Sequence, residues 1–153
     1  MLKLALPLTF LAVLVLGSPA ASRADETRGT AEEAQALVAR AVALYDQKGE
    51  QALAEISAPD NAFRDRDLYI FVIGPDHKIV ARAIDQSRIG LDITEQHDAD
   101  GYAYGKAFVE KATPEGAWVD YRFKDPISGE PLAKSSWLML HDGYIFGCGI
   151  YKP

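Results

Sequence analysis

Three strand-like segments follow one another near the C-terminal end of the sequence, and they constrain the fold more than any other feature. AWVDYRF begins at Ala117, AKSSWLML begins at Ala133 and YIFGCGIY begins at Tyr144. The loop KDPISGEP, with two prolines and one glycine, separates the first two segments, and the turn HDG separates the last two. Strands joined by connections this short pair in antiparallel order. We therefore expect a three-stranded antiparallel sheet between Ala117 and Tyr151.

A second hairpin lies upstream of this sheet. LYIFVIG (Leu68–Gly74) is rich in β-branched and aromatic residues, PDHK is typical of a turn, and IVARAI (Ile79–Ile84) is the return strand. The total is then about five strands. Between the two groups we expect the loop RIGLDI and a helix over Ala99–Ala112, with Asp98 or Asp100 as its N-cap.

The N-terminal part of the domain is helical. Thr30 and Glu33 in TAEE have the spacing of a capping box, and apolar residues then recur every three or four positions up to Tyr45. Gly49 suits the position after a helix C-terminus, and EQALAEIS predicts a shorter second helix. The fold class that follows is α+β: a central antiparallel sheet of about five strands, with a long N-terminal helix and helices packed on one side.

The start of the chain has the pattern of a secretory signal peptide. Lys3 precedes a thirteen-residue apolar run from Leu4 to Leu16, and small residues follow before Asp25. A retained membrane anchor is the alternative, but a span needs about 20 apolar residues. We expect residues 1–24 to be cleaved and residues 25–153 to form one periplasmic domain that does not insert directly into the membrane.

Charge and composition exclude several function classes. Residues 25–153 contain 14 basic and 22 acidic side chains, a formal net charge of −8, which opposes binding to nucleic acid or anionic lipid. Cys148 lies alone in an apolar segment and predicts a buried thiol. The three histidines, His77, His97 and His141, have no metal-binding or catalytic spacing. We therefore expect no metal, no cofactor and no catalysis.

The ordered blocks of the chain resemble a single Cache domain of type 2, an extracytoplasmic sensor family with a PAS-like fold. The blocks are FRDRDLYIFVIGPDHKIVARA, IGLDI, DGYAYGKAFVEKA, GAWVDYRFKDPISGEPLAKSSW and GCGIY. The most specific positions are Trp118, Tyr121, Phe123, Pro126, Gly129, Lys134, Gly147, Gly149, Ile150 and Tyr151. The resemblance covers Thr30–Tyr151 and implies a domain that binds a small ligand. Two positions depart from the family pattern: Arg82 replaces a frequent histidine, and Asp92 replaces a frequent asparagine.

Lys134 and Arg82 are the expected ligand contacts. Lys134 belongs to the family motif, and a buried lysine needs a counter-charge that a small carboxylate would supply. The Arg82 guanidinium can hold a carboxylate in two parallel hydrogen bonds. The alternative for both is a solvated surface position, the usual fate of charged side chains.

Three aromatic residues complete the predicted site. Tyr121 offers a hydroxyl donor and an aromatic wall, with plain core packing as the alternative. Tyr69 and Trp118 are weaker predictions, and strand alternation places Trp118 on the face opposite Tyr121. We expect a non-catalytic domain that binds a small organic acid and acts through a membrane receptor, a histidine kinase or a transporter, since the sequence continues only to Pro153. A structural module without ligand is the alternative, and a small secreted enzyme is a weaker one.

Overall fold

The computed structural model describes residues 27–152, and the predicted signal peptide therefore lies outside the described residues. The helices are α1 (Ala31–Lys48), α2 (Gln51–Ile56) and α3 (Tyr104–Lys111), and the single 3₁₀ turns are η1 (Gln86–Arg88) and η2 (Ile93–Glu95). The strands are β1 (Arg64–Asp65), β2 (Leu68–Ile73), β3 (Ile79–Arg82), β4 (Ala117–Lys124), β5 (Pro131–His141) and β6 (Tyr144–Tyr151).

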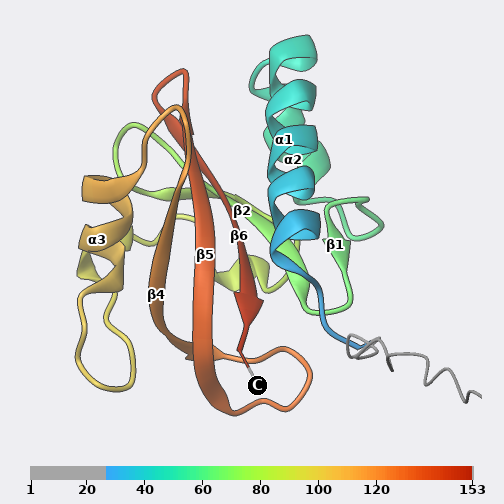
Figure 1. Ribbon diagram of the computed structural model, residues 1–153. Helices are drawn as coiled ribbons and strands as arrows, with labels where there is room; N and C mark the ends of the chain where they lie inside the picture. Colours follow the sequence, from blue (N-terminus) through green and yellow to red (C-terminus); the bar gives the residue numbers. More distant parts are fainter. Residues whose placement is uncertain (1–26, 153) are drawn as a thin grey trace, which may run out of the picture.

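The strands form one antiparallel sheet in the order β1-β2-β6-β5-β4, and β3 also pairs with β2 (Figure 1). The last three strands pair in chain order, as the sequence predicted, because short connections join them. The last strand, β6, then crosses to pair with β2, which joins the N-terminal hairpin to the C-terminal strands. The predicted α+β fold with a central antiparallel sheet is confirmed.

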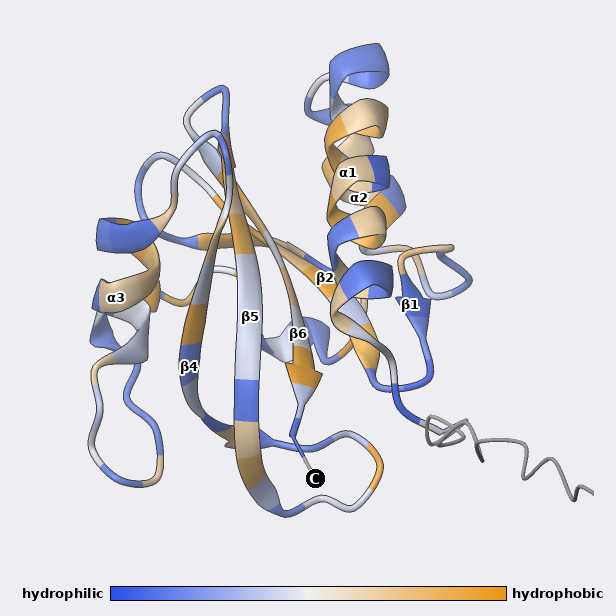
Figure 2. Ribbon diagram, viewed as in Figure 1, coloured by the Kyte–Doolittle hydropathy of each residue, from blue (hydrophilic) through white to orange (hydrophobic). Residues whose placement is uncertain are grey.

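The long helix α1 covers one face of the sheet, beside β2, β5 and β6 (Figure 1). Its capping box is present: the Thr30 hydroxyl accepts from the backbone N–H of Glu33, and the Glu33 carboxylate accepts from the backbone N–H of Thr30. Tyr45 packs its ring 5.6 Å from that of Phe146 on β6. Figure 2 shows apolar residues gathered on β2 and on α1, whereas β1 is polar.

The other face of the sheet packs against α3. Phe108 stacks on Phe71 of β2 with 5.6 Å between ring centroids, and Tyr104 stacks on Tyr121 of β4 at 4.7 Å. Since Phe71 pairs with Gly147 and Phe146 lies one residue earlier, α3 and α1 contact opposite faces of the sheet. Space for the Phe71 ring depends on Gly147, because a Cβ there would lie 2.2 Å from the ring.

The third helix is shorter than predicted. It begins at Tyr104 rather than near Ala99, and its N-cap is Ala103, so neither Asp98 nor Asp100 caps it. Asp98 instead accepts from the backbone N–H groups of Asp100, Tyr102 and Arg122, and so fixes the preceding loop against β4. The local sequence predicted an aspartate as the helix N-cap. The hydrogen bond from the backbone of Arg122 on β4 instead holds Asp98 in the loop before the helix.

Gly105 is expected to be the least replaceable residue of α3. A Cβ at this position would lie 1.6 Å from the Ile93 carbonyl oxygen of η2, so α3 would have to move away from η2. We expect Gly105→Ala to lower the free energy of unfolding by about 3 kcal/mol, the upper range for overpacking. Urea unfolding measures this, with exposed Lys106→Ala on the same helix as the control. A loss below about 0.5 kcal/mol would contradict the contact.

Candidate functional site

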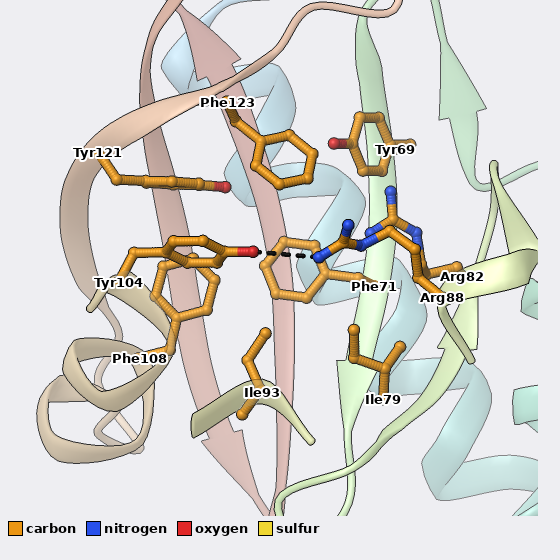
Figure 3. A pocket seen from close by; sticks show the side chains of 10 residues that line it. All are labelled: Tyr69, Phe71, Ile79, Arg82, Arg88, Ile93, Tyr104, Phe108, Tyr121 and Phe123. Carbon is orange, nitrogen blue, oxygen red and sulfur yellow. Dashed lines mark hydrogen bonds between the residues drawn. The ribbon is translucent and has the colours of Figure 1, made fainter. Parts of the chain in front are cut away.

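A cavity lies between the sheet and the layer formed by α3 and η2 (Figure 3). The space inside its wall, counted out to the open mouth, is about 290 Å³. Six aromatic rings, two isoleucines and two arginines form its wall. They are Tyr69, Phe71, Ile79, Arg82, Arg88, Ile93, Tyr104, Phe108, Tyr121 and Phe123. The two arginines are the charged groups of this wall, so the cavity favours an anion.

Arg82 enters this cavity from the end of β3. It is 5% exposed, its Nε donates to the carbonyl oxygen of Ile84 at 3.0 Å, and its guanidinium carbon lies 5.2 Å from the centre of the Tyr69 ring. In the described part of the chain, no carboxylate forms an ion pair with Arg82. A buried guanidinium without a counter-charge can receive a carboxylate.

Lys134 is buried, at 1% exposure, but the cavity wall described above does not include it. Its Nζ donates to the Tyr69 hydroxyl at 2.7 Å and to the Tyr151 hydroxyl at 3.1 Å, and lies 4.1 Å and 4.4 Å from the centres of the two rings. Gly149 provides the space, because a Cβ there would lie 2.1 Å from the Lys134 Cε. The lysine therefore reaches the cavity through Tyr69.

Tyr69 lies in the cavity wall and contacts both buried cations, Lys134 through its hydroxyl and Arg82 through its ring. Burial alone would raise its pKa, but the positive charges of Lys134 and Arg82 outweigh burial and lower the pKa below the ordinary value. Lys134 can only donate, so the Tyr69 oxygen accepts from it and the hydroxyl keeps its own proton. A phenol with a lowered pKa is a strong donor to an anion.

Tyr121 lies in the same wall, on the face of β4 that alternation predicted. Its hydroxyl shares a hydrogen bond with the Ser136 hydroxyl at 3.0 Å, and burial raises its pKa well above the ordinary value. It is therefore a neutral hydroxyl beside the aromatic stack.

Trp118 is not brought to the cavity. It lies on the opposite face of β4, where its ring is 5.4 Å from that of Trp137 on β5. The structure thus brings together four of the five predicted residues: Tyr69, Arg82 and Tyr121 in the wall, with Lys134 behind Tyr69.

Arg88 is a cavity residue that the sequence analysis missed. It ends η1, and its Nη2 donates to the Gln96 side-chain oxygen at 2.9 Å and to the Tyr104 hydroxyl at 3.2 Å. Its Nε is buried without a hydrogen-bond partner in the described structure. The segment SRIG around Arg88 has no periodicity to orient a side chain, so no local pattern could have identified it.

A wider cavity of about 930 Å³, including its open mouth, adjoins the first one. The two share Tyr69, Arg82, Arg88 and Phe123, and the outer one is bordered by residues 124–129 of the β4–β5 loop. Within residues 27–152, no cluster of His, Cys, Asp and Glu side chains could hold a metal ion, and no helix has the length and hydropathy to cross a membrane.

The family model for the single Cache domain 2 matches residues 14–151. The chain belongs to this family. A curated relative is the methyl-accepting chemotaxis protein McpP of Pseudomonas putida, 27% identical over 140 residues. The alignment covers 85% of this Cache domain chain but 25% of McpP, so the chain spans about a quarter of that relative's length.

Solved structures share the fold of this Cache domain. A methyl-accepting chemotaxis protein from Vibrio parahaemolyticus RIMD 2210633 superposes with a TM-score of 0.66 and 19% identity, over 78% of this chain and 86% of that one. A second solved structure is described as the structural basis for carboxylic acid recognition by a Cache chemosensory domain. It superposes with a TM-score of 0.62 and 22% identity, over 80% of this chain and 92% of that one. These structures show the shared Cache fold, and membership of the single Cache domain 2 family makes the chain a sensory ligand-binding domain.

Proposed function

We propose that this Cache domain senses a small organic acid and has no catalytic activity. The observation that supports the proposal best is the pair of arginines, Arg82 and Arg88, facing an aromatic cavity whose wall contains no carboxylate among the described residues. The carboxylate of such a ligand would accept hydrogen bonds from the Arg82 guanidinium and from the Tyr69 hydroxyl. The aromatic rings would cover the apolar part of the ligand. The solved Cache domain with carboxylic acid recognition is consistent with this ligand class.

We further propose that residues 1–24 direct export and are removed, so that the domain works in the periplasm. The binding state would pass to a membrane partner such as a receptor, a histidine kinase or a transporter. The match to part of a methyl-accepting chemotaxis protein supports a role in signal transduction. An enzyme is less favoured, because the cavity wall contains no histidine, cysteine or carboxylate among its described residues.

A thermal-shift screen of the exported chain tests the ligand class. We expect short carboxylates to stabilise the protein by about 2.7 kcal/mol when present at 100 times their dissociation constant, whereas the matching neutral amides have no effect. Arg82→Gln should remove the response, and Arg40→Gln, an exposed arginine on α1, should retain it. If no acid stabilises the protein and Arg82→Gln raises its melting temperature, the domain is a structural module without ligand.

A further inference from the structure

The cation content of the site exceeds what one carboxylate would neutralise. Arg82 and Arg88 line the inner cavity, and Lys134 donates to Tyr69 in the same wall. Within residues 27–152, no acidic side chain forms an ion pair with any of these three cations. Arg82 and Lys134 are buried and Arg88 is half-buried, and an unpaired buried charge costs several kcal/mol, so a ligand with a single negative charge would leave part of this cost in place.

Arg88 is placed to act as a second anion receptor. It lines both cavities, as Arg82 does, and Figure 3 shows the two guanidinium groups on the same side of the inner cavity, across from Tyr104 and Tyr121. The hydrogen bonds from its Nη2 to Gln96 and Tyr104 fix its position, and both acceptors are neutral. Its Nε remains buried and unpartnered in the described structure.

The acids near the outer cavity limit the charge of the ligand. Asp125 is already held by two hydrogen bonds from Arg28, at 2.6 Å and 2.9 Å. Asp85 is exposed and accepts from the Ser87 hydroxyl at 2.6 Å. Asp85, Asp125 and Lys124 all border the outer cavity, and Asp125 is paired with Arg28, so this part of the wall carries no net positive charge. The positive charge is therefore concentrated at the boundary of the two cavities.

We infer that the ligand is a short-chain dicarboxylate, with one carboxylate held by Arg82 and Tyr69 in the inner cavity and the other held by Arg88 at the boundary with the outer cavity. The inference rests on the proposed function, because it concerns the same site. It assigns Arg88 as the residue that discriminates dicarboxylates from monocarboxylates of equal length. A monocarboxylate would still contact Arg82 and Tyr69.

Titration calorimetry with butyrate and succinate, which have the same carbon chain length, tests the inference. We expect succinate to bind at least tenfold more tightly than butyrate. Arg88→Gln should weaken succinate about tenfold more than it weakens butyrate, so that the preference disappears. Arg88→Lys, which keeps the charge but not the planar fork, should retain part of the preference, and Arg40→Gln should retain all of it.

The outcomes separate the inference from the proposed function. Equal affinities for butyrate and succinate, both dependent on Arg82, would overturn the dicarboxylate and leave acid sensing intact. A succinate preference that survives in Arg88→Gln would overturn the role of Arg88. If neither acid binds, both the inference and the proposed function are wrong. Circular dichroism of each variant checks that it folds. If Arg88→Gln does not fold, the comparison of Arg88→Lys with the unmodified protein tests the role of Arg88.

Discussion

Replacing Lys134 with methionine is expected to weaken the binding of a small carboxylate by about tenfold or more. Lys134 does not line the cavity, so its effect must pass through Tyr69, whose hydroxyl it holds at 2.7 Å. A hydrogen bond to a charged group contributes about 1.5–3 kcal/mol, which corresponds to roughly tenfold or more in affinity. Calorimetry of the variant with a carboxylate that binds the unmodified protein measures the change.

The same substitution should leave the domain folded. Methionine has a similar length and no charge, and because Lys134 forms no ion pair within residues 27–152, its removal also removes the cost of burying an unpaired charge. We expect the free energy of unfolding to change by less than about 1 kcal/mol. An affinity that stays unchanged in the folded variant would show that the site around Tyr69 is wrongly assigned.

A spectroscopic measurement distinguishes this role of Lys134 from simple packing. Against the effect of burial, the charges of Lys134 and Arg82 lower the pKa of Tyr69. Removing the Lys134 charge should therefore raise the pKa of Tyr69, so that the tyrosinate signal appears at higher pH. Lys106→Met, at an exposed position of α3, should leave the titration unchanged. A Tyr69 titration identical in both variants would contradict the coupling.

Lys134 has partners other than the ligand carboxylate that its motif predicted. The motif indicated a buried lysine that needs a partner, and the structure supplies two phenols where a ligand carboxylate was expected. Sequence alone could not show this, because Tyr69 and Tyr151 come from β2 and β6, on separate parts of the chain. Arg82 is buried in the cavity wall although it departs from the family pattern, while Trp118 follows the alternation of its strand to the other face.

Elements with strong local patterns were predicted well. The capping box at Thr30 and the antiparallel order of the last three strands both depend on residues close in sequence. The start of α3 and the position of Arg88 depend instead on contacts between distant segments. Asp98 is bound by the backbone of Arg122, and Arg88 is held by Gln96 and Tyr104, so neither position follows from spacing.

Arg28→Ala is expected to cause a large loss of stability, about 3 kcal/mol. Arg28 precedes α1 and holds Asp125 through two hydrogen bonds, at 2.6 Å and 2.9 Å, and it lies 3.4 Å from Asp67. Both aspartates are fully buried, so removing the guanidinium leaves uncompensated buried charge, which costs about 3–5 kcal/mol in other proteins. We expect the lower end because the Arg28 side chain is 25% exposed.

Chemical unfolding measures this loss, and an exposed ion pair provides the matched control. Lys48 pairs with Glu55 at 2.6 Å on the surface, with 43% and 47% of the two side chains exposed. Lys48→Ala should cost less than about 1 kcal/mol. If both variants lose the same small amount, the Arg28 ion pair is no stronger than a surface pair.

The same ion pair predicts an acid dependence of stability. Hydrogen bonding to Arg28, with further hydrogen bonds from Ser128, lowers the pKa of Asp125 in the folded state. Its contribution is therefore complete above the unfolded pKa of about 3.9 and is lost as the pH falls towards the folded value. The difference in unfolding free energy between the unmodified protein and Asp125→Asn should be large at pH 7 and smaller at pH 3. A difference that is constant or grows on acidification would contradict the charge on Asp125. Because residues 125–129 border the outer cavity, the result would also show how firmly Arg28 holds this loop beside the site.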